Sequence, residues 1–138
     1  MPEHLKFRLL PGAYAIVRLA ADAAVPEWAA KGGFSSATRT GDELSIVCCT
    51  DNIPQGVDSG LRWVCLKLEG PFAFSQTGIL LSFIEPLSNS GIPIFAISTY
   101  DTDYVLVQEE FAGAALNALQ AAGHELWPRG ESWRKFIE

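Results

Sequence analysis

The chain has 138 residues, which is room for one ordinary domain or two very small ones, and its 49% hydrophobic and 19% charged residues exclude an intrinsically disordered chain. The formal net charge of −6 argues against a nucleic-acid-binding protein, because contacts with the phosphate backbone need clustered Lys and Arg. No apolar run approaches the roughly 18–20 residues of a membrane span and the N-terminus lacks the pattern of a signal peptide, so we expect a cytoplasmic protein that binds neither membranes nor nucleic acid.

Apolar patterning predicts several strands and one short helix in the N-terminal part of the chain. Between Leu5 and Leu10, apolar residues alternate with basic ones, which is the period of a half-buried strand. The turn residues Pro11 and Gly12 end this strand. The elements expected next are a strand at Ala13–Leu19, a short helix within Asp22–Ala30, and a hairpin with strands Phe34–Arg39 and Glu43–Cys49.

The C-terminal part predicts two strand–helix–strand crossovers. Between Phe74 and Ser88, apolar residues recur at spacings of three and four, which places them on one helix face, and Pro86 predicts a kink or a short restart. Two crossovers joined by a hairpin give an antiparallel four-stranded sheet with both helices on one face. The elements expected are a strand at Trp63–Leu68, the helix at Phe74–Ser88, strands at Pro93–Tyr100 and Tyr104–Gln108, a helix at Glu109–Ala122 and a short strand at His124–Trp127.

The two parts resemble a degenerate repeat of strand, helix and hairpin, separated by the loop Asp51–Gly60. We therefore expect an α+β protein with a first, incomplete module at residues 1–60, a second module at residues 61–128, and a C-terminal tail at residues 129–138.

The three cysteines, Cys48, Cys49 and Cys65, form no CxxC pair, and His4 and His124 are remote from them in sequence. This spacing argues against a zinc site, so we expect buried free thiols, no metal and no cofactor. The chain also lacks the GxSxG, P-loop, HExxH and GxGxxG motifs, which indicates a protein that is not an enzyme.

Two loops carry the residue types of a binding site. The loop Gly70–Gly78 precedes the expected start of a helix, where unpaired N–H groups suit a carboxylate and glycines let a ligand approach the backbone. The segment Ile97–Asp103 is a polar hairpin tip. Asp101 and Asp103 there are open to three readings: turn formers that bond their own backbone, acid–base or metal ligands, or partners of a cationic or amine-bearing ligand.

These two loops also carry a family resemblance. The stretch IFAISTYDTDYVLV (Ile94–Val107) resembles a signature of the ACT-like family related to the CASTOR-type amino-acid sensors, and GPFAFSQTGILLSFIEPLSNSGI (Gly70–Ile92) fits it as well. The opening LLPGAYAIVRL (Leu9–Leu19) is compatible with the same family. The resemblance implies two tandem ACT-like modules of the ferredoxin-like βαββαβ plan, which are regulatory and often bind amino acids at interfaces between modules.

We therefore predict a regulatory protein that senses an amino acid, with the ligand's α-carboxylate on backbone N–H groups at Phe72–Ser75. Its amine is expected to face Asp101 or Asp103 and the hydroxyls of Ser98 or Thr99. Pairing of sheet edges predicts a homodimer. The alternatives are a module of the same fold that binds another protein without a small ligand, and a small enzyme without a recognisable motif. The predicted ligand-binding residues are Gly70, Phe72, Ser75, Gly78, Ser98, Thr99, Asp101 and Asp103.

Overall fold

The computed structural model describes residues 4–70, 72 and 77–127 of the chain, which divides into two units. One unit, here called the helical unit, combines residues 1–11 with residues 64–138. The other, the strand unit, comprises residues 12–63. Each unit has a hydrophobic core of its own, and each is described separately.

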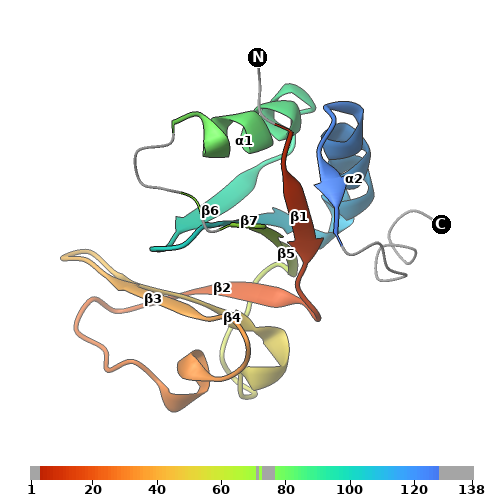
Figure 1. Ribbon diagram of the computed structural model, residues 1–138. Helices are drawn as coiled ribbons and strands as arrows, with labels where there is room; N and C mark the ends of the chain where they lie inside the picture. Colours follow the sequence, from red (N-terminus) through yellow and green to blue (C-terminus); the bar gives the residue numbers. More distant parts are fainter. Residues whose placement is uncertain (1–3, 71, 73–76, 128–138) are drawn as a thin grey trace. The chain divides into compact units, whose positions relative to one another are not determined.

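The helical unit is a sheet with two helices on one face (Figure 1). The order of its strands is β6-β7-β5-β1-β8, and the hairpin β6–β7 pairs Ile94 with Val107 and Ser98 with Asp103. The elements are β1 (Lys6–Leu9), β5 (Trp63–Leu68), α1 (Ile79–Asn89), β6 (Ile94–Ser98), β7 (Asp103–Gln108), the 3-10 turn η3 (Glu109–Phe111), α2 (Ala112–Ala121) and β8 (Glu125–Leu126).

Strand β1 corrects the expected division of the chain at residue 60. It lies in the sheet of the helical unit, antiparallel to β5 with Phe7 opposite Leu68, and parallel to β8 with Phe7 opposite Leu126. The sheet is therefore mixed and contains β1 in addition to the four strands expected. The physical reason is burial: Phe7, which is fully buried, packs against the core under the helices, and its ring centroid lies 5.3 Å from that of Phe83.

Helix α1 begins later than the sequence predicted, at Ile79 instead of Phe74, and it runs through Pro86 to Asn89. Gly78 precedes it in the left-handed region (φ +78°), which glycine adopts without steric cost. Pro86 has no N–H to donate to the Ser82 carbonyl four residues earlier. The Nε2 of His124 lies 2.8 Å from that carbonyl oxygen and takes the place of the missing donor.

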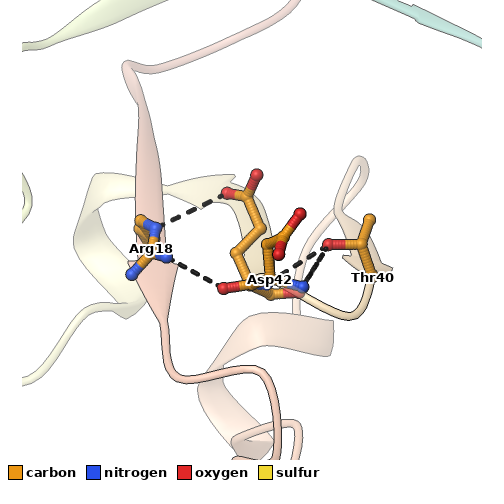
Figure 2. Close-up of polar contacts among 4 residues, drawn as sticks. Arg18, Thr40 and Asp42 are labelled. Atoms are coloured by element: carbon orange, nitrogen blue, oxygen red, sulfur yellow. Dashed lines mark hydrogen bonds and ion pairs between the residues drawn. The ribbon is translucent and has the colours of Figure 1, made fainter.

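The strand unit contains three antiparallel strands in the order β3-β4-β2. At the tip of its β3–β4 hairpin, Thr40 Oγ1 accepts hydrogen bonds from the N–H groups of Asp42 and Glu43, and Arg18 donates to the Asp42 carbonyl at 2.9 Å (Figure 2). The helix expected within Asp22–Ala30 is a single 3-10 turn. The elements are β2 (Tyr14–Leu19), η1 (Glu27–Ala30), β3 (Ser36–Arg39), β4 (Leu44–Cys49) and η2 (Thr50–Asn52).

The three cysteines are free thiols, as predicted, and Cys48 and Cys65 are buried whereas Cys49 is half-buried. Burial raises the pKa of the Cys65 thiol to about 12, so this group stays protonated and unreactive at neutral pH.

In the described part of the chain, no group of three or more His, Cys, Asp or Glu side chains could hold a metal ion. Neither α1 nor α2 has the length and apolar character to cross a membrane, and this holds for every described helix.

Candidate functional site

The helical unit contains an open cavity of about 430 Å³ between the β6–β7 turn and the start of α1. The turn residues Ser98–Asp103 line one side, and Gly78 with the first turn of α1 lines the other. Phe72 contributes the remaining described side chain. A cavity of this size lies within the range of roughly 300–1,000 Å³ that small-molecule sites occupy.

The turn itself is held by its own polar groups. The Thr99 N–H donates to the Thr102 carbonyl at 2.8 Å, and the Thr99 hydroxyl donates to the same oxygen at 3.1 Å. The Thr99 hydroxyl oxygen also accepts the Thr102 N–H at 3.4 Å. Thr99 lines the cavity, but its hydroxyl is already hydrogen-bonded to Thr102 within the turn.

The two aspartates of the turn differ in their surroundings. The Ser98 hydroxyl donates to Asp103 Oδ1. The Asp101 carboxylate is exposed and has no hydrogen-bond or ion-pair partner among the described residues. Burial raises the pKa of the nearby Tyr104, and Asp101 is among the neighbouring groups that raise it further. The site therefore suits a cationic group, and Asp101 is the carboxylate available to it.

The opposite side of the cavity is the N-terminus of α1. Its first helical hydrogen bond runs from the Ser82 N–H to the Gly78 carbonyl at 2.9 Å. The N–H groups of Ile79, Leu80 and Leu81 therefore have no acceptor within the helix, and all three residues line the cavity. The positive end of the helix dipole lies here as well, so this side suits a carboxylate.

The structure brings most of the predicted site residues to one cavity. Phe72, Gly78, Ser98, Thr99, Asp101 and Asp103 all line the cavity, whereas Ser75 lies outside the described residues. The Phe72 N–H donates to the Asp101 carbonyl at 3.0 Å, so it is not available to a ligand carboxylate as predicted. The N–H groups without a helical acceptor are instead those at Ile79–Leu81, because α1 begins at Ile79 rather than at Phe74.

The sequence analysis missed several lining residues. Leu81 and Tyr100 are large apolar side chains at the rim, exposed by 59% and 79%, and Thr102 is buried beneath the turn. Helical spacing placed Leu80 on the inner face of the helix but gave no reason to assign it to a ligand. Tyr100 and Thr102 both lie in the polar stretch ISTYDTD, which could have indicated them. Without the geometry of the turn, however, the sequence did not distinguish its buried positions from its exposed ones.

Gly70 does not line the cavity, but it lies close to the backbone of Asp101 and Phe72, which do. A Cβ at this position would lie 2.9 Å from the Asp101 carbonyl oxygen and 3.1 Å from the Phe72 nitrogen, both of which are backbone atoms. We expect Gly70→Ala to displace the Asp101 backbone and to weaken ligand binding by about tenfold or more, since binding depends on the position of the carboxylate. Titration calorimetry checks this, with Gly41→Ala as the control because no atom lies within 4 Å of a Cβ at Gly41. Unchanged affinity in Gly70→Ala would show that this close contact is irrelevant to the site.

Comparison with known proteins identifies the matching families. Residues 58–121 match the model of the ACT domain, and residues 12–56 match a model of the N-terminal domain of a further family. The "Cytosolic arginine sensor for mTORC1 subunit 1" proteins of Homo sapiens, Bos taurus and Pongo abelii are each 33% identical over 63 residues. This match covers 45% of the chain and 19% of each relative, so the chain matches only about a fifth of their length.

Two solved structures share the fold over most of the chain. A crystal structure of a protein from Agobacterium tumefaciens is 52% identical, with a TM-score of 0.82 over 90% of this chain and 92% of the other. A Vibrio cholerae protein of unknown function, described as a possible transport protein, is 23% identical, with a TM-score of 0.72 over 86% of this chain and 89% of the other. The second likeness concerns the fold alone.

Proposed function

Residues 58–121 of this chain match the ACT-domain family, and on that premise we propose that the protein is a regulatory protein that binds a free amino acid in the cavity between the β6–β7 turn and the start of α1. The ligand's α-carboxylate accepts hydrogen bonds from the N–H groups at Ile79–Leu81, and its amine lies against Asp101. The family's regulatory, ligand-binding role supports the proposal that this protein is not an enzyme.

The observation that carries the proposal is the separation of charge across one cavity. Asp101 presents a carboxylate without a described partner on one side, and the first turn of α1 presents N–H groups without helical acceptors on the other. A zwitterion carries one group complementary to each side. An amide or a simple sugar would leave the carboxylate without a counter-charge, so the arrangement favours an amino acid over a neutral ligand.

The two carboxylates favour an amino acid whose side chain is also cationic. Asp101 and Asp103 both line the cavity, and no Lys or Arg does so among the described residues. With Asp101 on the ligand's amine, Asp103 is placed to meet a second positive group. The relatives with 33% identity are named arginine sensors, which supports placing L-arginine first among the amino acids to be tested.

We propose further that the protein is a homodimer and that residues 12–63 act as a second ACT-like module. Among the described strands, β6 pairs only with β7, which leaves its other edge open to a second copy. Leu81 and Tyr100 stand exposed at the cavity rim, where a neighbouring module would cover them. The same exposed pair supports the second candidate function, a module that binds another protein without a small ligand.

A panel of the twenty amino acids tests the proposal by thermal unfolding. At about one hundred times its dissociation constant, a ligand stabilises the folded protein by about 2.7 kcal/mol, which raises the melting temperature by several degrees. We expect at least one amino acid to do so, and we expect Asp101→Asn to remove most of that shift, since a hydrogen bond to a charged group contributes about 1.5–3 kcal/mol.

The matched control is Asp42→Asn, which makes the same change of charge on the exposed hairpin tip of the strand unit, at a residue that does not line the cavity. It should keep the full ligand-dependent shift. A folded wild-type protein that none of the twenty amino acids stabilises would exclude amino-acid binding and favour the protein-binding alternative. A shift that survives in Asp101→Asn would remove Asp101 from the site.

A further inference from the structure

Thr102 is a buried polar residue in the cavity lining, with 6% of its surface exposed. Its hydroxyl donates to the carbonyl of Leu68, the last residue of β5, at 2.8 Å. Its carbonyl accepts both hydrogen bonds from Thr99. Thr102 therefore ties the tip of the β6–β7 hairpin to the neighbouring strand through its side chain and closes the turn through its backbone.

Asp101 precedes Thr102 and is held on its other side. Its carbonyl accepts the Phe72 N–H at 3.0 Å, and Gly70 lies so close behind it that a Cβ there would be 2.9 Å from the same oxygen. The backbone of Asp101 is thus fixed from two directions, by the hydrogen bond of the neighbouring Thr102 to β5 and by the segment that follows β5. Its carboxylate takes no part in these contacts and has no hydrogen-bond or ion-pair partner among the residues that the structure describes.

Fixing this backbone matters because the tip is otherwise exposed. Asp101 itself is exposed, so few packing contacts of its own side chain restrain it. A carboxylate on a mobile tip would have to be ordered by the ligand, and the entropy lost in that ordering would weaken binding. A carboxylate that is already in place avoids this cost.

We propose that Thr102 is a positioning residue that presents the Asp101 carboxylate to the ligand cavity through the hydrogen bond of its hydroxyl to the Leu68 carbonyl. This inference rests on the proposed function for the identity of what Asp101 binds. The turn geometry that Thr102 maintains exists without a ligand and can be measured without one.

The test compares Thr102→Val, which keeps the shape but loses the hydroxyl, with Thr102→Ser, which keeps the hydroxyl. In the ligand-free protein, we expect Thr102→Val to speed amide hydrogen exchange at Thr99 and Phe72, whose hydrogen bonds depend on the turn. We expect it to bind the amino acid that stabilises the wild-type protein most about tenfold more weakly. Thr102→Ser should restore exchange rates and bring affinity to within about threefold of the wild type.

Thr50→Val is the matched control. It removes a comparable hydroxyl-to-carbonyl hydrogen bond, from Thr50 to Ala13 at 3.4 Å in the strand unit. It should leave affinity unchanged even if it lowers the melting temperature, which separates positioning from general stability. If Thr102→Val does not fold, Thr102→Ala removes the same hydroxyl without adding bulk, and the same comparison applies.

Two results would overturn the inference: wild-type affinity in a folded variant without the hydroxyl, or weakened binding with exchange at Thr99 and Phe72 unchanged. Failure of the proposed function looks different, because then no amino acid stabilises even the wild-type protein. In that event the exchange rates of Thr102→Val still decide whether Thr102 holds the turn.

Discussion

Replacing Phe83 with alanine should destabilise the helical unit by about 3–5 kcal/mol, the usual cost of removing a buried aromatic side chain. Phe83 lies on α1 and is fully buried. Its ring meets that of Phe7 edge to face at 5.3 Å and lies 5.5 Å from the ring of His124. The substitution therefore opens a cavity where α1, β1 and the segment before β8 meet, and chemical denaturation measures the loss of unfolding free energy.

Leu81→Ala is the control on the same helix. Leu81 is 59% exposed, so its truncation should change the free energy of unfolding by less than about 0.5 kcal/mol. A loss below about 1 kcal/mol in Phe83→Ala would mean that the core under α1 is not packed as described.

Replacing His124 with leucine should cost the next largest amount of stability and should alter its pH dependence. The buried ring joins two parts of the unit: Nδ1 accepts the Leu5 N–H at 3.1 Å, and Nε2 donates to the Ser82 carbonyl that Pro86 leaves without a helical donor. Leucine satisfies neither group. Leaving the buried Leu5 N–H unpaired costs about 1–3 kcal/mol, and loss of the hydrogen bond to the Ser82 carbonyl adds to this cost.

The pH dependence follows from the same geometry, because Nδ1 accepts a hydrogen bond only while it is unprotonated. Burial lowers the pKa of His124 below its ordinary value of 6.5; the hydrogen bond to Ser82 opposes this shift, and the neighbouring His4 adds to it. Between the lowered pKa of His124 in the folded protein and its ordinary value of 6.5, the unfolded chain binds the proton more readily than the folded protein. The contribution of His124 to stability is therefore complete above pH 6.5 and is lost as the pH falls through the lowered pKa.

Unfolding measured between pH 7.5 and 5.5 tests this dependence. The difference in unfolding free energy between the wild type and His124→Leu should shrink as the pH falls, because groups common to both proteins cancel in the difference. His124→Asn, whose amide oxygen can still accept the Leu5 N–H but does not titrate, is the second comparison. A difference that stays constant over this range would show that His124 does not change protonation there.

The sequence predicted most of the helical unit because its elements have strong local patterns. Strands expected at Pro93–Tyr100 and Tyr104–Gln108 are observed as Ile94–Ser98 and Asp103–Gln108. The start of α1 was misplaced because the predicted helix was extended back to Phe74, although the apolar residues at helical spacing begin only at Ile79 and Gly78 in its left-handed conformation sets the start.

The placement of β1 in the N-terminal module was wrong for a different reason. Its alternating pattern correctly predicted a strand, but nothing local distinguishes pairing with β2 from pairing with β5 and β8, which lie 54 or more positions further along the chain. Likewise, only the family resemblance indicated from the sequence that the loops containing Gly70 and Asp101 form one site. It could not show that the Phe72 N–H and the Thr99 hydroxyl are already occupied within the protein.

The most direct test of the central claim is a crystal structure of the protein with the amino acid that stabilises it most. We expect density in the cavity of about 430 Å³, with the ligand's carboxylate within hydrogen-bonding distance of the N–H groups at Ile79–Leu81 and its amine on Asp101. The helical unit offers a second cavity of about 450 Å³, lined by Ser82, Glu85 and His124 among others. An amino acid bound there, or bound with its carboxylate toward Asp101, would contradict the account.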